Sequence, residues 1–409
     1  MSSAIDRILL RRMVNSTACD VNVSSGSMEA LRAWLLGSAA GLWLDRSVDR
    51  SDGGFFDQLS FDEARNACEF KRLRVCARQI FVFAKMAGWG VSGARAAALH
   101  GLDYLFTRLR HPDGGFIRST TLKGVPLDET RDLYDHAFVV FALAAAYKVT
   151  GESAVMDEAR NVLDLIAGAM AHPAGGFVES LPPVLPRRQN PHMHLLEACL
   201  AWIPLVDDPI FFLAARDLIH LFENHLYRSG DRVLFEFFDD SWNLPSDPYL
   251  CTFEPGHHFE WIWLLGEARR LGVACEGTDA IGCALGETVQ AYGFGSVGLP
   301  LGSLLKPPGG VVAVQDTTCR IWVVTEWLRA SLVQPGSGVG SADPAMVWLQ
   351  RYLDVPVKGL WHERCDAATG RFKSEPVPAS SLYHIVSGLS PIMTIDPLSG
   401  ARPNEEPKA

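Results

Sequence analysis

The sequence predicts an all-α fold, an (α/α)6 barrel made of about six helical hairpins. A motif that recurs at a fixed interval indicates a repeated supersecondary unit, and the segments between its copies have the apolar spacing of α-helices. No linker interrupts this pattern along most of the 409 residues. We therefore expect one large helical domain instead of the two or three that the length alone would suggest.

The repeated motif is Gly-Gly-Phe, which occupies residues 53–55, 114–116 and 175–177, so that successive copies are 61 residues apart. The second copy continues as Ile117-Arg118-Ser119 and the third as Val178-Glu179-Ser180. Weaker echoes follow at Leu234-Phe235-Glu236, at residues 309–312 and at residues 370–372. Because glycine allows positive φ, each copy is typical of a turn under which the phenylalanine packs.

Helix-period segments lie between these turns. They cover residues 70–87, 132–149, 154–171 and 191–206. Each interval has room for two helices and a short turn or hairpin. Hairpins that close on themselves bury one ring of helices inside another, which gives the (α/α)6 barrel, whereas an open helical solenoid is the competing arrangement. The later echoes are too degenerate to decide between the two by spacing alone.

We assign residues 28–398 to this single catalytic domain. Residues 1–27 have two arginines after a short apolar patch but no apolar core with a small-residue cleavage site, so we expect a flexible leader and not a signal peptide. Residues 334–342 are flexible in composition, but helical patterning resumes at residues 343–353. The polar residues 399–409 are expected to form a disordered tail.

The composition excludes several classes of partner. A formal net charge of -10 without a Lys/Arg run argues against nucleic acid, and no segment has the ~18 consecutive apolar residues of a membrane span. The 9 cysteines form no CxxC pair and are odd in number, which is typical of free thiols in a reducing cytoplasm. We therefore expect a cytoplasmic protein that binds neither nucleic acid nor membranes, and the sequence leaves a homo-oligomer open.

Candidate catalytic histidines first occur in the block at residues 187–198. Asn190 is a good N-cap and Pro191 suits the first helical position, so His192 and His194 fall in the first turn. Glu197 lies one turn below His194. A helix N-terminus stabilises nearby negative charge, which would help a sugar oxygen to become an alkoxide. The alternative is that both histidines only cap or pack the helix.

The block at residues 254–265 places an imidazole and a carboxylate together. Glu254 precedes Pro255, which is a helix-start signal. His257 and Glu260 share one face of that helix, and a carboxylate beside an imidazole raises the pKa of the histidine and orients its ring. We therefore expect Glu260 to pair with His257. His258 points elsewhere by about 100° of helical rotation and is expected to be structural.

Other candidates are polar residues in otherwise apolar segments. His384 belongs to what should be the last hairpin, which in a closed barrel packs against the first, although a lone histidine is more commonly a core or capping residue. Arg78 lies in an apolar helix, with a snorkelling surface arginine as the alternative. Tyr134 lies at the start of another helix. Arg320, Trp322 and Glu326 form a polar and aromatic face, for which a barrel-lining salt bridge is the alternative.

These polar residues should meet in one pocket. The inner helices of a closed helical barrel run in the same sense, so their N-termini collect at one end. That end is expected to hold Arg78, Tyr134, Asn190, His194, His257, Glu260 and His384. Aromatic walls would cover the apolar faces of a sugar ring, and the charged groups would bind its hydroxyls.

The same blocks resemble the N-acylglucosamine 2-epimerase superfamily. The likeness rests on RRQNPHMHLLEA at 187–198, EPGHHFEWIWLL at 254–265 and SSLYHIV at 380–386, with DLYDHAF and RIWVVTEW as further blocks, and it spans about residues 40–395. The intact NPHMH string at 190–194 is most similar to the branch of mannose isomerase and sulfoquinovose isomerase. Val323 and Val324 depart from the Pro-Gln that the family often has. Membership implies an (α/α)6 barrel.

The resemblance also implies roles for individual residues. His257 and His384 match the acid/base pair, and His194 and Glu260 match residues that assist ring opening and orient the sugar. The remaining matches are hydroxyl-binding positions at Arg78, Tyr134 and Asn190, and a wall block at Arg320 and Trp322.

We therefore expect an aldose–ketose isomerase of a free monosaccharide, from D-mannose to D-fructose, that works through a cis-enediol without metal or cofactor. A sugar 2-epimerase is the alternative if two bases share the proton. A glycoside hydrolase on the same barrel would need a second buried acid beside Glu260. A metal hydrolase using His192, His194, His257 and Glu260 lacks the HExxH spacing. A non-catalytic sugar-binding protein is the last alternative.

The substrate itself is not fixed by the sequence. A 6-phosphate or a 6-sulfonate would need a cationic pocket away from the histidines. Arg187 and Arg188 are the candidates for it, with surface charges as the alternative.

Overall fold

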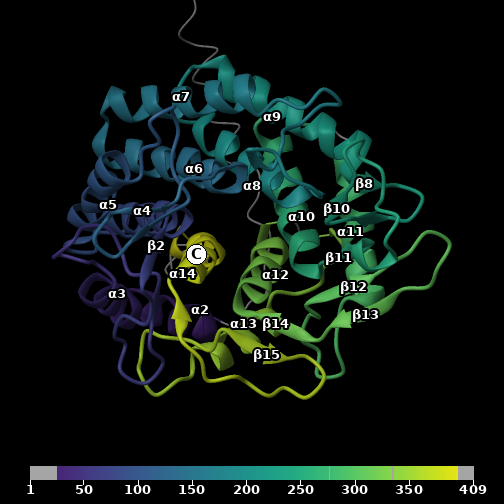
Figure 1. The fold of residues 1–409 in the computed structure, drawn as a ribbon. Helices are drawn as coiled ribbons and strands as arrows, with labels where there is room; N and C mark the ends of the chain where they lie inside the picture. Colours follow the sequence, from purple (N-terminus) through teal and green to yellow (C-terminus); the bar gives the residue numbers. More distant parts are fainter. Residues whose placement is uncertain (1–24, 276, 334–335, 395–409) are drawn as a thin grey trace, which may run out of the picture.

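The structure is a computed structural model that describes residues 25–275, 277–333 and 336–394. Six helices form its inner ring (Figure 1). They are α4 (Leu73–Gly88), α6 (Leu133–Thr150), α8 (Gln189–Trp202), α10 (Pro255–Arg270), α12 (Ile321–Val333) and α14 (Ser380–Thr394). Each contacts the next along the chain, and α14 contacts α4. The ring is therefore closed, which confirms the predicted (α/α)6 barrel over the open solenoid.

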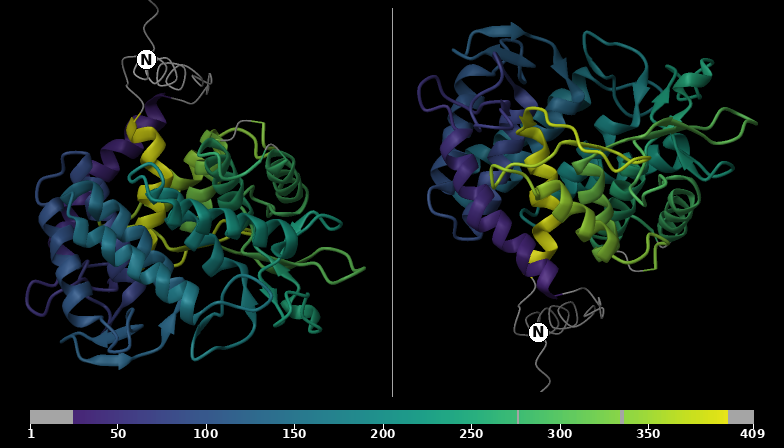
Figure 2. Two further views of the ribbon diagram at one scale, coloured as in Figure 1. Left: turned by 90° about the horizontal axis from the view of Figure 1, so that it is seen from above. Right: turned by 90° about the horizontal axis from the view of Figure 1, so that it is seen from below.

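An outer ring of helices surrounds the inner one. Its members are α5 (Ala94–Arg108), α7 (Ser153–Ala169), α9 (Pro209–Leu221), α11 (Thr278–Tyr292), α13 (Asp343–Leu353), and α2 (Ser25–Ala33) with its continuations Trp34–Ala39 and α3 (Ala40–Arg46). The outer helices α5, α7, α9, α11 and α13 each pack on the inner helix that precedes them in the chain, whereas α2 packs on α14. Figure 2 shows this last contact, with α2 in purple beside α14 in yellow. The first and last parts of the described chain thus form one hairpin unit.

The hydrophobic patterns explain which helix lies in which ring. In α6 the residues 135–146 are buried without interruption, so the helix is covered on all sides. In α7 only one stripe is buried, which includes Val155, Ala159, Val162 and Ile166. A helix that is apolar all round must be interior, and an amphipathic helix covers it with its apolar face.

Short antiparallel strands connect the helices. They are β1 (Gln58–Leu59), β2 (Phe70–Arg72), β3 (Ser119–Thr121), β4 (Pro126–Asp128), β5 (Arg131–Asp132), β6 (Ser180–Leu181), β7 (Arg187–Arg188), β8 (Tyr227–Arg228), β9 (Val233–Leu234), β10 (Phe237–Phe238), β11 (Thr252–Phe253), β12 (Ser303–Leu305), β13 (Ala313–Asp316), β14 (Thr318–Arg320), β15 (Arg364–Asp366) and β16 (Val377–Pro378). Their sheets are β1-β16, β2-β3-β4, β5-β6, β7-β10, β8-β9, β11-β12-β13 and β14-β15. The pair of Gln58 with Pro378 joins the first loop to the last one.

Each Gly-Gly-Phe copy forms the turn that follows an outer helix. Phe55, Phe116 and Phe177 form single β-bridges with Val48, Arg110 and Ala171. The second glycine of each copy has a φ of 71°, 74° or 68°, as the motif predicts.

A histidine on the following inner helix holds the turn in place. The backbone N–H groups of Phe116 and Phe177 donate to Nε2 of His136 and His192, at 3.0 and 2.9 Å. Nδ1 of each ring bonds to the carbonyl oxygen four residues earlier. His258 bonds in the same way to Glu254 O and Leu234 N. His192 and His258 therefore have structural roles. For His192 this was the alternative to a catalytic role, and for His258 it was the expectation.

Two of the weaker echoes are out of register. The bridges that follow α11 and α13 are Phe294 with Pro300 and Lys358 with Leu360. Residues 309–312 lie instead in the connection between β12 and β13, and residues 370–372 follow β15. Reading these two echoes as copies of the turn was wrong, because glycines also serve hairpins inside the loops.

The division into a leader, a domain at 28–398 and a tail stays a prediction, because residues 1–24 and 395–409 lie outside the described residues. Within the described residues no helix is long and apolar enough to cross a membrane. The eight cysteines in this part of the chain are all free thiols.

Neighbouring glycines in the second motif copy offer a test of the turn. Gly114 has a φ of +88° and open space where a Cβ would lie, whereas a Cβ at Gly115 (φ +74°) would lie 2.5 Å from Leu165 Cδ2 and 2.6 Å from His136 Nε2. Gly114→Ala should cost about 1–2 kcal/mol, which is the strain of the left-handed backbone alone, and Gly115→Ala should cost clearly more. Urea unfolding of both variants measures this, and equal losses would contradict the packing of His136 against the turn.

Candidate active site

One small pocket lies at the N-terminal end of the inner helices. It has a volume of about 180 Å³ and is lined by Arg78, Tyr134, Asn190, His194, Glu254, His257, Glu260, Arg320, Trp322, Ser381 and His384. All nine residues selected from the sequence are in this set. The volume is below the roughly 300–1,000 Å³ typical of pockets for drug-sized ligands, so the pocket suits a small molecule. The partial positive charge of the helix N-termini faces it.

The repeat explains why these side chains meet. The sixth residues of α4, α6, α8, α10 and α12 are, in this order, Arg78, Phe138, His194, Glu260 and Glu326. The fifth residue of α14 is His384. Because each unit begins its inner helix at the same depth, one position per helix is directed to the barrel axis. These six residues are called the axial ring below. Five of the six are polar and buried.

His384 is held as a neutral imidazole. Its Nδ1–H donates to Glu326 Oε1 at 2.8 Å, which leaves Nε2 as the free nitrogen. Burial and the charges of Arg78 and other cations lower the pKa of His384 well below its usual range. The ring lies against Trp322, with 5.4 Å between the centroids. A neutral histidine with an unoccupied Nε2 is suited to accept a proton.

His257 is held as an imidazolium. Its Nδ1 is 2.9 Å from Glu236 Oε1 and 3.6 Å from Glu254 Oε2. Burial opposes the charge, but the two carboxylates and the hydrogen bond override it and raise the pKa of His257 to about 10. Its ring also contacts Trp322, with 5.1 Å between the centroids. The two histidines therefore share one pocket and one aromatic wall but differ in protonation.

The pairing of His257 with Glu260 was wrong. Both residues lie on one helix and line the pocket, but the hydrogen-bond partner of His257 is Glu236, from the loop that precedes β10. The Glu260 carboxylate lies at the axis instead, with Oε1 3.7 Å from His194 Nδ1. A side chain from another unit reaches the imidazole more directly than one a single turn away on the same helix.

Glu260 is a buried acid without a protein hydrogen bond on either oxygen. Burial and the neighbouring charges of Glu326 and Glu197 raise the pKa of Glu260 well above its usual range, which favours the protonated carboxyl. His194 donates from Nδ1 to Glu197 at 3.3 Å, and burial lowers its pKa to about 4. An unpartnered buried acid that lines a pocket is expected to bond a ligand.

Asn190, like Glu260, has a buried polar atom without a hydrogen-bond partner. Its Nδ2 lies 3.1 Å from Nε2 of His257, while its Oδ1 is buried without a partner. Turning the amide by 180° would present Oδ1 to the Nε2–H of a protonated His257. Either orientation leaves one polar group of Asn190 for a ligand.

Arg78 ties three units together beside the pocket. It donates to Tyr134 Oη at 2.6 Å and to the carbonyl of Ser380 at 3.2 Å, and its guanidinium lies 4.0 Å from the centroid of the Phe138 ring. Arg320 forms an ion pair with Glu363 at 2.9 Å and has a side chain that is 45% exposed. Arg320 thus lies at the rim of the pocket and is part of its lining. It also forms a salt bridge, which was the alternative to a substrate contact.

A buried ionic layer lies under the axial ring. Arg329 bonds Glu197 at 3.1 Å and Glu326 at 3.3 Å, and Tyr383 Oη donates to Glu197. The hydrogen bond from His194 and the charge of Arg329 overcome burial and lower the pKa of Glu197 to about 2. This layer fixes the carboxylates that orient His194 and His384.

The sequence reasoning missed Glu236, Arg329 and Tyr383 as parts of the site. Glu236 had a signal, because it takes the place of Glu179 in the motif echo. The backbone carbonyls of both residues accept a hydrogen bond from the first residue of the preceding inner helix, Leu133 for Glu179 and Gln189 for Glu236. Arg329 lies three residues after Glu326, a spacing that puts both on one helix face.

Three groups of side chains in the described part of the chain could hold a metal ion. They are His194 with Glu197 and Glu260, Glu236 with Glu254 and His257, and Glu260 with Glu326 and His384. None combines the four residues considered from the sequence, since His192 is engaged by its turn.

The fold and pocket define a class of protein, the (α/α)6 barrels whose polar site lies at the N-terminal end of the inner helices. The sequence profile of the N-acylglucosamine 2-epimerase (GlcNAc 2-epimerase) family matches residues 54–388. The chain belongs to this family and is a sugar isomerase or epimerase.

Known relatives agree with this assignment. The chain is 34% identical to a mannose-6-phosphate isomerase of Rhizobium meliloti (strain 1021), over 90% of this chain and 97% of the relative. A crystal structure of D-mannose isomerase matches with a TM-score of 0.77 at 21% identity, over 90% of this chain and 97% of that one. A cellobiose 2-epimerase from Bacillus thermoamylovorans B4167 matches with a TM-score of 0.79 at 18% identity, over 90% and 99%. The two structures show the fold alone.

The charge on His257 can be tested through its two carboxylates. Glu236→Gln removes the nearer anion, so the pKa of His257 falls from about 10 and the ring loses its proton at lower pH. The alkaline limb of kcat/KM for a sugar substrate should then move to lower pH by at least about one unit. Glu254→Gln, which removes the anion at 3.6 Å, is the matched control and should cause a smaller shift. An unchanged limb in Glu236→Gln would show that His257 is not the group that titrates.

Proposed function

We propose that this chain is an aldose–ketose isomerase that converts D-mannose to D-fructose with His384 as the base. The supporting observation is the contrast in one pocket between a neutral His384, whose Nε2 is free, and a protonated His257. Taking a proton from the carbon next to an aldehyde needs a base and a stabilised oxyanion. The pocket contains one candidate for each task.

The reaction would begin with opening of the pyranose ring. A proton must leave O1 and reach O5, and a group that can both give and take a proton assists this step. Glu260, whose raised pKa favours the protonated form, is adjacent to the neutral His194, with 3.7 Å between Oε1 and Nδ1. These two residues are assigned to ring opening and to orientation of the open sugar.

In the next step Nε2 of His384 removes the proton from C2 of the open aldose. The electron pair forms the C1–C2 double bond, and the carbonyl π electrons move to O1. The imidazolium of His257 stabilises this oxygen and supplies a proton, which gives the cis-enediol. His257 then takes the O2 proton while His384 returns its own proton to C1, so the ketose forms and both histidines regain their first states.

The 2-epimerase alternative requires a proton to be delivered to the opposite face of C2. A protonated His257, with its pKa raised to about 10, could supply this proton, so the charge of His257 suits either reaction. The preference for the isomerase rests on the relative that matches over 90% of this chain, which is named a mannose-6-phosphate isomerase. Sugar chromatography of the products separates fructose from glucose, the epimer of mannose.

Mannose 6-phosphate is the second candidate substrate, because the relative that matches over 90% of this chain is named a mannose-6-phosphate isomerase. Against it, Arg187 and Arg188 are paired with Asp240 and Glu179 and do not line the pocket. The acids Glu254 and Glu260 do line it. Arg320 at the rim is the cation that a phosphate could reach.

Two further alternatives from other enzyme classes have simple tests. A glycoside hydrolase could use Glu254 and Glu260, which both line the pocket, and would release reducing sugar from a disaccharide. A metal-dependent enzyme would lose its activity after dialysis against a chelator. We expect neither result. Homo-oligomer formation stays a prediction.

Loss of the base should abolish the isomerisation. His384→Ala should lower kcat/KM for mannose by about 10²–10⁴ because general base catalysis is removed. In deuterium oxide the unaltered chain should form fructose with solvent label at C1. The exposed His220 of α9 provides the control, since His220→Ala leaves the pocket intact. Normal turnover by a folded His384→Ala protein would exclude His384 as the base.

The substrate is identified by a panel of mannose, lyxose, glucose, N-acetylglucosamine, sulfoquinovose and mannose 6-phosphate. We expect mannose to have the highest kcat/KM, with fructose as its product. A preference for mannose 6-phosphate by tenfold or more, lost in Arg320→Gln, would replace free mannose by its phosphate.

A further inference from the structure

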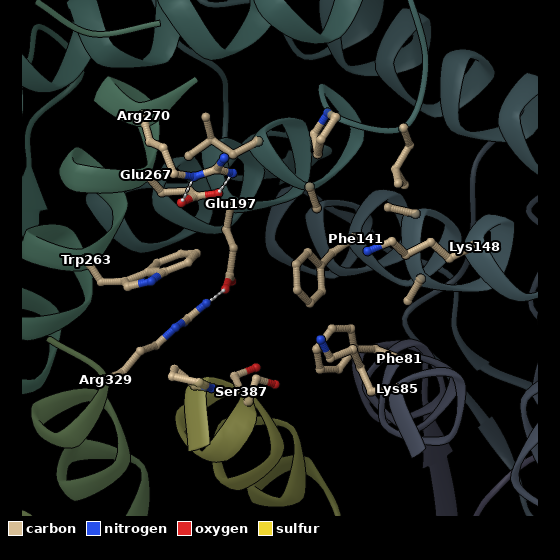
Figure 3. Close-up of a pocket in the computed structure, with 18 residues that line it drawn as sticks. Phe81, Lys85, Phe141, Lys148, Glu197, Trp263, Glu267, Arg270, Arg329 and Ser387 are labelled. Atoms are coloured by element: carbon tan, nitrogen blue, oxygen red, sulfur yellow. Dashed lines mark hydrogen bonds and ion pairs between the residues drawn. The ribbon is translucent and has the colours of Figure 1, made fainter. Parts of the chain in front are cut away.

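A second cavity opens at the other end of the barrel. It has a volume of about 690 Å³ and shares no lining residue with the candidate active site. Figure 3 shows its labelled side chains, which come from α4, α6, α8, α10, α12 and α14. The cavity is called the rear cavity below.

The inner wall of the rear cavity is the layer directly below the axial ring. It consists of Phe81, Phe141, Glu197, Trp263, Arg329 and Ser387, each three residues after its axial-ring neighbour. Three of these side chains are aromatic, and the Arg329 guanidinium lies 3.3 Å from the centroid of the Trp263 ring. The wall therefore offers flat apolar surfaces to a ligand in the rear cavity.

The charges of the rear cavity do not balance. Its lining includes four cationic and two acidic residues. Glu197 bonds Arg329 and Glu267 bonds Arg270. Figure 3 shows both pairs as dashed lines, on the side of the cavity opposite Lys85 and Lys148. Within the described residues neither Lys85 nor Lys148 has an ion pair or a hydrogen bond through its ammonium group.

The two lysines also repel each other. Burial together with the charges of Lys148 and Arg329 lowers the pKa of Lys85 to about 8. Cations in the last turn of a helix are favoured by the helix dipole, and Lys85 and Lys148 both occupy such positions. That effect accounts for solvated lysines, but Lys85 is only partly exposed. Its Nζ lies 5.6 Å from the centroid of the Trp89 ring, and no carboxylate in the described part of the chain offsets the charge of Lys148. An anion between the two would relieve the repulsion.

We propose that the rear cavity binds a small anionic molecule with a flat apolar body, such as an aryl phosphate. Its anionic group lies between Lys85 and Lys148, and its ring packs against Phe81, Phe141 and Trp263. This site is separate from the sugar pocket, and its existence does not depend on which sugar reaction the chain catalyses.

The ionic layer connects the two ends of the barrel. Arg329 lines the rear cavity and bonds Glu326, which orients His384. Glu197 lines it as well and bonds His194. One residue, Glu197, therefore separates the rear cavity from His194, and two residues, Arg329 and Glu326, separate it from His384.

Calorimetric titration of the full chain with phenyl phosphate tests the proposal. We expect one site, with phenol not binding because it lacks the charge and inorganic phosphate binding more weakly because it lacks the ring. Benzoate serves as the carboxylate arm and identifies which anionic group is preferred. Lys85→Gln and Lys148→Gln should each weaken phenyl phosphate binding at least tenfold.

Controls separate the two ends of the barrel and guard against misfolding. Arg320→Gln removes a cation from the sugar pocket, and Lys358→Gln removes an exposed surface lysine, so neither should change the affinity. Lys148 is exposed, so its variant remains informative if Lys85→Gln does not fold. Absence of binding at millimolar phenyl phosphate, equal affinity in the Lys148→Gln protein, or loss of binding in Arg320→Gln would each overturn the proposal.

Discussion

Closure of the inner ring is the constraint on which the rest of the structure depends. Once six helices of the same direction surround one axis, each must direct one residue per turn at the centre. The polar side chains at that centre are buried, so each of them needs a partner. The axial ring and the ionic layer below it satisfy this demand for most of their atoms. Among the residues that line the sugar pocket, the buried atoms without a partner are both carboxyl oxygens of Glu260, Oδ1 of Asn190 and Nε of Arg78.

The same constraint sets the two histidines to different states. Both are buried imidazoles that bond a carboxylate through Nδ1, and both contact Trp322. The difference lies in the surrounding charge. His384 faces the cations Arg78 and Arg329, whereas His257 faces Glu236 and Glu254. Two copies of one side chain thus become a base and an acid through their neighbours.

Much of the fold could be predicted from the sequence, because the turn motif and the helix period recur at one interval. All nine selected residues line one pocket, since the repeat that sets helix length also sets the depth of each side chain. The partner of His257 could not be predicted in the same way. Glu260 is near in sequence, but contact between units depends on loop paths, and Glu236 reaches the ring from a loop.

The later echoes failed for a related reason. The glycine pair at residues 309–310 and the glycine at 370 lie in hairpins within the loops, and only the backbone bridges show which residues form the repeated turn. The ionic layer was also missed. The spacing of Glu326 and Arg329 could have indicated their ion pair, but Glu197 binds Arg329 and Tyr383 from another helix, and no local pattern predicts that. Long-range pairing of buried charges is visible only once the barrel is closed.

The central claim is that one pocket holds a neutral and a charged histidine at the same pH. Nitrogen NMR of the chain labelled at histidine, with His257→Gln and His384→Gln for assignment, measures this most directly. We predict that one ring stays protonated until about pH 10 and that the other is neutral throughout the neutral range. Titration of both rings together near pH 6.5, the ordinary value for histidine, would contradict that claim.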